Sequence, residues 1–515
     1  MKRALFSVYK KDGIETFAEY LSGRGYEIVS SGGTYKYLKD KGVPVTELSS
    51  ITGFPEVLGG RVKTLHPMVH SGILACADNP DHLADLKKHG IEPIEYVVVS
   101  LYPFEETAAD PKALPADIIE QIDIGGVTLI RAAAKNHRFV NIIVDNSDFE
   151  KIMEEIDEHG STSEETRLAL AAKAFGHTAY YDGLISSWFF ARSGKTAFPA
   201  ECSIPMKLDE EMRYGENPHQ AAALYRSGIA DNISVLNSEV HGGKKLSYNN
   251  IMDTDAAIDI LREFAGGKPF CVIIKHTNPC GAAEGKDVRD AYERALAGDP
   301  ASAFGGIVGF NTRLDAETAK LIHERFYEII VATGYEPEAI EILKEKKNLR
   351  IIEIKGNDWT KKGMSYRRVE SGMLAQGWDM PGMDNEKFDC VTAKSPDGTI
   401  GDLKFAWKIC KYVKSNAIVY AKGGQLVGVG AGQMSRVDSA RIAVMKAHDA
   451  GFALDGAVMA SDAYFPFRDS VDNAAKEGII AIIQPGGSMR DQESIDAANE
   501  RGIAMVFTGV RHFRH

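Results

Sequence analysis

The sequence has little of what marks a secreted, membrane-bound or nucleic-acid-binding protein. Its six cysteines form neither a C-x-x-C pair nor a metal-ligand spacing, so we expect a reducing compartment and no cysteine-held metal. No apolar run approaches the length of a membrane span, and the opening apolar stretch is too short for a signal peptide. The formal net charge of -12 leaves no broad basic field for nucleic acid or a membrane surface. These absences predict a soluble, cytoplasmic protein.

The chain is rich enough in apolar residues for more than one hydrophobic core. Hydrophobic residues make up 44% of its 515 residues, a length that exceeds what one core normally holds. In the first part, apolar runs alternate with patterns of helical period, as in a parallel βαβ sheet. The expected strands are residues 5–8, 26–30, 96–100 and 142–144, and the expected helices are residues 14–24, a helix from 35, and 163–190. Residues 191–211 show no sustained period, which predicts a linker and two domains, residues 1–200 and 201–515.

The second part again mixes strands and helices, so the predicted fold class is α/β throughout. The expected strands are residues 270–274, 303–310, 458–461, 479–484 and 503–508, with a charged helix at 336–347. Residues 416–422 and 425–430 predict a β-hairpin that turns at Gly423-Gly424.

A lysine and a histidine follow one of the most apolar of these strands. Residues 270–274 lead into Lys275-His276, and Asn278-Pro279 with Gly281 are expected to end the strand and turn the chain. Ligands of α/β proteins bind beyond such strand ends. The ammonium group of Lys275 disfavours a second positive charge on the imidazole, so His276 is a candidate neutral base near pH 7. For the dipeptide alone, a solvated strand end without function is the favoured alternative.

Two glycine-containing segments of the first part are candidate phosphate sites. Ser31-Gly32-Gly33-Thr34 lies between a strand and a helix, where successive N–H groups suit phosphate. It lacks the three-glycine dinucleotide fingerprint, which argues against a nicotinamide cofactor. In residues 59–67, Arg61 and Lys63 project on one side if the segment is extended, which would make an anion clamp. A polar surface loop explains that segment equally well.

Acidic, basic and phenolic side chains are expected at the same edge of the first sheet. Asp123 precedes a helix on which Thr128, Arg131 and Lys135 share a face, and Tyr102 follows a buried strand. Lysine, tyrosine and aspartate together suit proton transfer without a metal.

The second part has three further candidate segments. Residues 213–220 form a loop dense in hydrogen-bonding groups, and residues 428–436 make a glycine-rich turn with its own arginine, Arg436. The Asn416 amide could donate to a carbonyl oxygen as it gains charge. Aromatic residues within 461–469 could line a flat heterocycle, although a hydrophobic staple with Asp469 as the helix cap is an alternative that can coexist with binding.

Taken together, these segments resemble the family of bifunctional purine biosynthesis proteins, from Phe6 to His515. The segments are residues 59–67, 121–137, 213–220, 275–281, 415–436 and 461–469. The resemblance implies an N-terminal IMP cyclohydrolase domain with a methylglyoxal-synthase-like parallel-sheet fold. It also implies a C-terminal transformylase region of two cytidine-deaminase-like halves, and a homodimer with transformylase sites built across its interface.

For the C-terminal domain, the resemblance implies formyl transfer from 10-formyltetrahydrofolate, a reduced folate, to 5-aminoimidazole-4-carboxamide ribonucleotide (AICAR). His276 would accept the proton of the weakly nucleophilic amine, Lys275 would assist His276 and the departing folate nitrogen, and Asn416 would hold the formyl oxygen. The residues implied to bind substrate are Arg213, Tyr214, Asn250 and Arg436 for the ribonucleotide, Tyr464 and Asp469 for the folate, and His515 as a further site residue.

For the N-terminal domain, the resemblance implies closure of formyl-AICAR to IMP with loss of water, an intramolecular reaction that depends on orientation. No catalytic metal is expected. The implied phosphate-binding residues are Ser31, Gly32, Gly33, Thr34, Arg61 and Lys63, with Thr64 as a further substrate-binding residue, and those around the ring-closing atoms are Lys63, Tyr102, Asp123 and Lys135. The sequence departs from the family where Tyr9-Lys10-Lys11 replaces the common Ser-Asp-Lys, and where Tyr464 replaces the common phenylalanine.

Two other function classes are disfavoured by particular residues. A zinc-dependent deaminase needs Pro-Cys-x-x-Cys, and Pro279-Cys280-Gly281-Ala282-Ala283 lacks the second cysteine. A regulatory nucleotide sensor would use the phosphate clamp but would have no use for the proton-transfer residues. The sequence therefore favours an enzyme.

Overall fold

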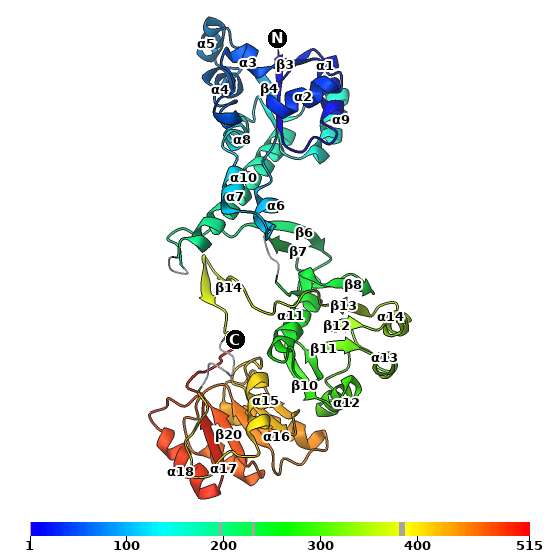
Figure 1. Ribbon diagram of the computed structural model, residues 1–515, viewed down its shortest axis with the longest axis vertical. Helices are drawn as coiled ribbons and strands as arrows, with labels where there is room; N and C mark the ends of the chain where they lie inside the picture. The colour runs from blue at the N-terminus through cyan, green and yellow to red at the C-terminus, as the bar shows by residue number, and fades with distance from the viewer. Residues whose placement is uncertain (1, 195–197, 229–231, 381–386) are drawn as a thin grey trace. The chain divides into compact units, whose positions relative to one another are not determined.

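The computed structural model describes residues 2–194, 198–228, 232–380 and 387–515 (Figure 1). The chain forms two compact units, the first of Met1–Asp209 with Tyr225–Ala230 and the second of Glu210–Leu224 with Asp231–His515. The predicted linker is partly regular structure, because residues 206–212 form strand β6 (Met206–Met212), which pairs with β7 (Ala222–Ser227). The domain boundary near residue 200 stays a prediction. No helix in the described part of the chain is long and apolar enough to cross a membrane.

The first unit is built on a five-stranded parallel sheet of order β3-β2-β1-β4-β5. The strands are β1 (Lys2–Val8), β2 (Tyr26–Ser30), β3 (Val45–Glu47), β4 (Ile94–Ser100) and β5 (Asn141–Ile143). The helices are α1 (Ile14–Gly23), α2 (Gly32–Asp40), α3 (Leu48–Thr52), α4 (Pro67–Leu74), α5 (Pro80–His89), α6 (Phe104–Ala109), α7 (Pro115–Glu120), α8 (Gly125–Lys135), α9 (Phe149–His159) and α10 (Glu164–Arg192). The predicted strands and the long helix α10 are confirmed.

The start of α2 differs from the prediction. The helix begins at Gly32 rather than near Tyr35, because Gly32 and Gly33 form its first turn and Ser31 precedes it with extended backbone angles. The predicted phosphate-binding turn is therefore the N-terminus of the helix itself.

The second unit contains a 12-stranded mixed sheet of order β16-β21-β20-β19-β17-β18-β10-β9-β11-β12-β13-β8. The strands are β8 (Glu239–Gly242), β9 (Phe270–Lys275), β10 (Asn278–Glu284), β11 (Ile307–Leu314), β12 (Ile329–Tyr335), β13 (Arg350–Glu353), β16 (Asp389–Cys390), β17 (Ile418–Lys422), β18 (Gln425–Gly430), β19 (Val458–Ser461), β20 (Ala481–Gln484) and β21 (Ala504–Phe507). The helices are α11 (Tyr248–Glu263), α12 (Val288–Gly298), α13 (Ala316–His323), α14 (Pro337–Lys344), α15 (Ile400–Cys410), α16 (Arg436–Asp449), α17 (Asp469–Lys476) and α18 (Asp491–Arg501). A separate hairpin consists of β14 (Met364–Val369) and β15 (Gly372–Gly377).

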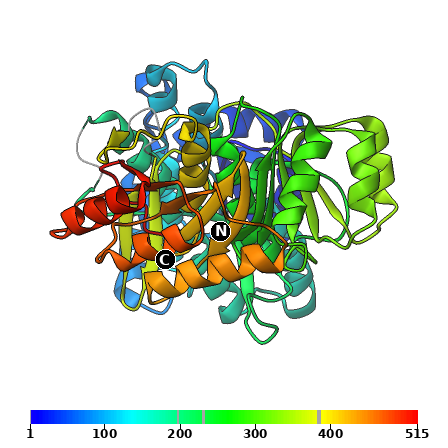
Figure 2. The same ribbon diagram turned by 90° about the horizontal axis from the view of Figure 1, so that it is seen from below.

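The same order of elements occurs twice in this unit. Each half runs helix, β-hairpin, helix, strand, helix, strand, helix, strand, from α11 to β13 and from α15 to β21. The two halves meet where β10 pairs with β18, and Figure 2 shows the green and orange strands adjacent. One apolar cluster contains residues from both halves, including Phe264, Phe270 and Phe405, whereas each half has a second cluster of its own. The C-terminal region is thus a duplicated α/β structure.

Two predictions for this unit need correction. Asn278-Pro279 was expected to end the strand, but Asn278 is the first residue of the next strand, β10. The two residues before it, His276-Thr277, form the turn, and β10 runs antiparallel to β9. Lys275 and His276 therefore lie at the tip of a hairpin. The strand expected at residues 303–310 begins only at Ile307, because turns occupy the preceding residues. The predicted hairpin at Gly423-Gly424 is confirmed.

Candidate active sites

The first unit contains a cavity of about 710 Å³ at the carboxyl ends of β1, β2 and β4. In this sheet, β2 and β3 lie on one side of β1, and β4 and β5, which come later in the chain, lie on its other side. Open α/β sheets bind ligands at such a switch point. Nine of the residues predicted from the sequence line the cavity: Ser31, Gly32, Gly33, Thr34, Arg61, Lys63, Thr64, Tyr102 and Asp123.

The N-terminus of α2 forms one wall of this cavity. Ser31 precedes the helix without a side-chain capping hydrogen bond, so the first N–H groups of α2 are directed at the cavity without that partner. Thr34 also lines the cavity, and its buried hydroxyl donates to the Val8 carbonyl at 2.9 Å and accepts the Val8 N–H at 3.2 Å. Thr34 thereby fixes the helix to the end of β1, and its predicted contact with phosphate stays a prediction.

Lys63, Tyr102 and Asp123 lie together in the lining of this cavity. Lys63 Nζ donates to Tyr102 Oη at 3.3 Å. The Asp123 carboxylate accepts the Gly126 N–H at 2.7 Å, and the Asp123 N–H donates to Tyr181 Oη at 2.9 Å. Burial raises the pKa of Asp123, while the Gly126 N–H and the charge of Lys63 act in the opposite direction. A carboxylate whose pKa is raised towards neutrality is suited to taking up and returning a proton.

Two glycines at the start of α8 allow this close arrangement. A Cβ atom at Gly125 would lie 2.6 Å from Thr64 Oγ1, and one at Gly126 would lie 2.5 Å from Asp123 Oδ2. Both distances are shorter than carbon and oxygen atoms can approach, so a larger residue would push Thr64 or Asp123 out of place.

The entrance of the cavity carries one predicted and two unpredicted side chains. Arg61 is exposed, and its Nε donates to Glu120 Oε1 at 3.1 Å. Tyr9 packs against Tyr102 with ring centroids 6.1 Å apart, and Lys11 Nζ donates to the Tyr9 carbonyl at 3.3 Å. Tyr9 and Lys11 were recognised only as a departure from the family, although their place directly after β1 could have predicted a position at the cavity.

Lys135 is separated from the other predicted residues of this site. It is exposed and is the last residue of α8, whereas the cavity is lined by the first residues of that helix. Ten residues of helix place it about 15 Å away along the axis. The first unit does not bring Lys135 to Lys63, Tyr102 and Asp123.

In the second unit, Lys275 ends β9 and His276 begins the turn. Lys275 Nζ donates to the carbonyls of Phe304 at 2.9 Å and Gly305 at 3.1 Å. The His276 side chain is exposed. Neither residue lines the cavity described above, nor a second one of about 520 Å³ formed by α16, α17 and Tyr420. The imidazole is accessible, but this chain by itself does not enclose it.

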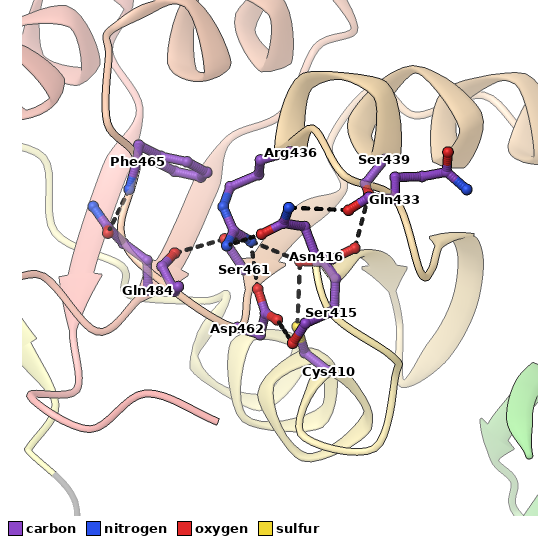
Figure 3. Close-up of polar contacts among 12 residues, drawn as sticks. Cys410, Ser415, Asn416, Gln433, Arg436, Ser439, Ser461, Asp462, Phe465 and Gln484 are labelled. Carbon is purple, nitrogen blue, oxygen red and sulfur yellow. Dashed lines mark hydrogen bonds and ion pairs between the residues drawn. The ribbon is translucent and has the colours of Figure 1, made fainter. Parts of the chain in front are cut away.

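Arg436 and Asn416 belong to a buried polar network (Figure 3). Arg436 is 9% exposed, forms an ion pair with the fully buried Asp462, and donates to Asn416 Oδ1 at 2.8 Å. The Asn416 amide nitrogen donates to the carbonyls of Gln433 at 3.0 Å and Met434 at 3.1 Å. A substrate that accepts a hydrogen bond from the Asn416 amide nitrogen must therefore displace one of these carbonyls.

Backbone contacts bring this network close to the His276 turn. The Lys414 N–H donates to Asn278 Oδ1 at 3.0 Å, directly after that turn. The Ser415 N–H donates to the Arg514 carbonyl at 2.9 Å, next to the last residue of the chain. The predicted residues gathered at this end of β10 and β18 are His276, Asn416 and His515.

The other predicted residues of this unit lie on separate elements. Asn250 is buried and its Oδ1 caps α11 by accepting the Ser247 N–H at 3.1 Å. Arg213 lies over the Tyr214 ring, with its guanidinium carbon 5.5 Å from the centroid. Tyr464 and Asp469 are both exposed, and Asp469 accepts the Ser470 N–H at 2.8 Å in the first turn of α17. None of these side chains lines either cavity.

Among the described residues, one cluster has the composition of a metal site. The ligand atoms of Glu239, His241 and Glu353 lie within 4.8 Å of one another on β8 and β13. Lys355 Nζ already lies 2.8 Å from Glu239 Oε2 and 2.6 Å from Glu353 Oε1, so the two carboxylates have a cationic partner. The cluster is most simply an ion-pair network that holds the edge strand β8 to β13.

Comparison with known proteins places the chain in a family. A family model described as the AICARFT/IMPCHase bienzyme matches residues 133–446, and a model described as an MGS-like domain matches residues 13–128. The chain is 52% identical over 518 residues to the bifunctional purine biosynthesis protein PurH of Persephonella marina and 48% identical over 515 residues to that of Bacillus cereus, with 100% of each chain covered. A solved structure titled "Crystal structure of ForH" is 32% identical and covers 38% of this chain, with a TM-score of only 0.34. The chain belongs to the family of bifunctional purine biosynthesis proteins that join AICAR formyltransferase to IMP cyclohydrolase.

Proposed function

We propose that the chain catalyses the last two steps of IMP synthesis at two separate sites. The second unit transfers a formyl group from 10-formyltetrahydrofolate to AICAR, and the first unit closes formyl-AICAR to IMP. The full-length similarity to PurH proteins supports both activities. The single structural observation that carries the proposal is the cavity lined both by Lys63, Tyr102 and Asp123 and by the N-terminus of α2.

Ring closure needs an anion site and a proton carrier in one enclosed space. The N–H groups of α2, Lys11 and Arg61 would hold the phosphate of formyl-AICAR at one end of the cavity. The carboxamide nitrogen then attacks the formyl carbon, and the formyl oxygen leaves as water after it has received two protons, one from the attacking carboxamide nitrogen and one from the formamide nitrogen. Lys63 and Tyr102 are placed to stabilise the oxygen as it gains charge, and Asp123 to relay the proton from the nitrogen.

Formyl transfer needs a base for the AICAR amine. The amine nitrogen attacks the formyl carbon, a tetrahedral intermediate forms, and the bond to folate N10 breaks. His276 would take the proton from the attacking nitrogen, and Lys275 would support protonation of the departing N10. The accessible imidazole supports this role, because a neutral base must reach its substrate.

We also propose that formyl transfer takes place in a homodimer. Lys275 and His276 lie on an open hairpin tip, and Arg213, Tyr464 and Asp469 lie on separate elements, so a second copy of the chain would supply the missing walls. Serial dilution tests this: the formyl transfer rate per chain is expected to fall once the dimer dissociates, while cyclisation of supplied formyl-AICAR stays constant. A formyl transfer rate that stays constant in a sample shown to be monomeric by sedimentation contradicts the dimeric site.

The most direct test of the function is turnover by the intact protein. With AICAR and 10-formyltetrahydrofolate supplied, we expect tetrahydrofolate and IMP to form in equal amounts. Formation of tetrahydrofolate without IMP, together with failure to cyclise added formyl-AICAR, would contradict the role of the first unit. Absence of both products would contradict the proposal as a whole.

All six cysteines are free, which supports the proposed cytoplasmic location.

A further inference from the structure

The turn that carries His276 has an unusual backbone. His276 and Thr277 have φ angles of 53° and 62°, in the left-handed region that side chains other than glycine disfavour. They are two of only four non-glycine residues with positive φ in the described part of the chain. A two-residue hairpin turn of this kind normally takes asparagine, aspartate or glycine.

The second half of the unit contains the matching turn in its ordinary form. Gly423 and Gly424 connect β17 to β18 with φ angles of 59° and 69°. The two hairpins occupy the same place in the repeated order of elements, so they differ in side chains while they share a backbone conformation. The first turn therefore has positive φ at two residues that carry side chains, where the second turn has glycines.

A carboxylate from the preceding helix holds each turn. In the first half, Asp253 of α11 accepts the Thr277 N–H through Oδ1 at 2.7 Å. In the second half, Asp402 of α15 accepts the N–H groups of Gly423 and Gly424, both at 2.7 Å. A helix carboxylate accepts N–H groups of the turn in both halves, but only the first turn carries a side chain, His276, that the proposed reaction uses.

We propose that Asp253 is a positioning residue for His276, which holds the strained turn so that the imidazole faces the reacting amine. The inference rests on the proposed role of His276 in formyl transfer. Without an acceptor for the Thr277 N–H, the turn relaxes towards negative φ, and the side chain of His276 changes direction with the backbone. Asp253 is half-buried, and burial raises the pKa of its carboxyl group, while the Thr277 N–H acts in the opposite direction.

The test compares three substitutions in the intact protein. Asp253→Ala removes the acceptor, and we expect kcat for formyl transfer to fall by about 10- to 100-fold, since a misplacement of about 1 Å at a reacting group has a cost of this order. The KM for AICAR is expected to change less, because Asp253 does not contact the nucleotide in this proposal. Asp253→Asn keeps an oxygen acceptor and is expected to retain most of kcat. Asp402→Ala breaks the matching bonds at Gly423-Gly424 and is expected to leave formyl transfer unchanged.

A second-site change separates positioning from general damage. Thr277→Gly in the Asp253→Ala background is expected to recover part of kcat, because glycine adopts positive φ without strain. Cyclisation of supplied formyl-AICAR and the melting temperature serve as folding controls in every variant. Loss in Asp253→Asn equal to that in Asp253→Ala would overturn the inference, since it would mean that the negative charge matters rather than the hydrogen bond. Full activity in Asp253→Ala, or equal loss in Asp402→Ala, would overturn it as well.

The outcome for His276 distinguishes this inference from the proposed function. If His276→Ala abolishes formyl transfer while Asp253→Ala does not affect it, the function stands and the inference fails. If His276→Ala retains formyl transfer, the role of His276 fails, and the inference fails with it.

Discussion

The two candidate sites of this chain are organised in opposite ways. In the first unit, nine predicted residues from four separate segments line one cavity at a switch point of a parallel sheet. In the second unit, Lys275 and His276 lie on an open hairpin tip, and Arg436 is already paired with the buried Asp462. Apart from Lys135, the residues predicted for the first site line one cavity within a single unit, whereas those predicted for the second site line neither cavity.

The difference has a physical origin in the two sheets. Neighbouring parallel strands end at the same edge, so the loops that follow them surround a common space. The hairpin of β9 and β10 instead projects its turn, and the flanking strands of this sheet are antiparallel. A hairpin tip can reach into a partner, but it cannot build a cavity by itself. The two sites should therefore respond differently to the same kinds of change.

The largest expected effect is the selective loss of one activity on changing His276. His276→Ala removes the proposed base, and we expect formyl transfer to fall by about 10²- to 10⁴-fold. Cyclisation of supplied formyl-AICAR should be unchanged, because His276 lies in the other unit. Separate assays of the two half-reactions measure this. Equal loss of both activities would show that the sites are not independent.

The reverse selectivity is expected for Lys63. Lys63→Met keeps most of the unbranched side chain but removes the ammonium group that donates to Tyr102 and acts on Asp123. We expect cyclisation to fall by about 10²-fold or more, as for loss of a preorganised donor to a developing oxyanion. Formyl transfer should remain, and the reaction should stop at formyl-AICAR, which chromatography would detect. Continued formation of IMP at the normal rate would argue against this site.

A smaller effect is expected from filling the space at the start of α8. Gly126→Ala places a methyl group against Asp123 and Leu101, and overpacking of this kind costs about 1–3 kcal/mol. We expect a lower melting temperature and impaired cyclisation, with formyl transfer preserved. Gly176→Ala is the matched control, because a Cβ atom there meets nothing within 4 Å. A variant at Gly126 as stable and active as the control would show that the wall of the cavity yields easily.

The smallest effect is a change in how stability depends on pH. Burial raises the pKa of Asp123 in the folded protein, so its ionisation costs stability as the pH rises through that pKa. Asp123→Asn removes this cost, and its melting temperature relative to the unmodified chain should increase as the pH rises above about 4, the ordinary pKa of aspartate. Asp145→Asn should instead lose stability relative to the unmodified chain as the pH rises from about 2 to about 4, because the hydrogen bond from Lys173 lowers the pKa of Asp145 to about 2. Differential scanning calorimetry measures both trends, and parallel curves for the two variants would contradict the assignment.

Local patterns in the sequence predicted much of the fold. The run of five apolar residues before Lys275, the Gly423-Gly424 turn and the helical period of α10 each depend on neighbouring residues, and the structure contains all three elements. The predictions for the start of α2 and for the chain after Lys275 were wrong. At the start of α2, Gly32 and Gly33 indicated a loop, but they form the first turn of the helix. After Lys275, the turn needs positive φ at His276 and Thr277, which residues of these types disfavour, so the sequence did not indicate it.

The residue types of the two sites could be named from the sequence, but their partners could not. The distance between Lys63 and Tyr102, the role of Thr34 in holding α2, and the position of Lys135 outside the cavity depend on segments far apart in the chain. The same holds for Asp253, which is an ordinary helix residue until β9 and β10 bring the Thr277 N–H to it.

The sequence by itself determined which segments form strands, helices and turns, because those choices depend on apolar period and on the backbone freedom of a few residues. The tertiary structure decided which polar groups meet, which carboxylates are buried, and which cations are already paired. Charges and hydrogen bonds act over a few ångströms in space, and only folding sets those distances.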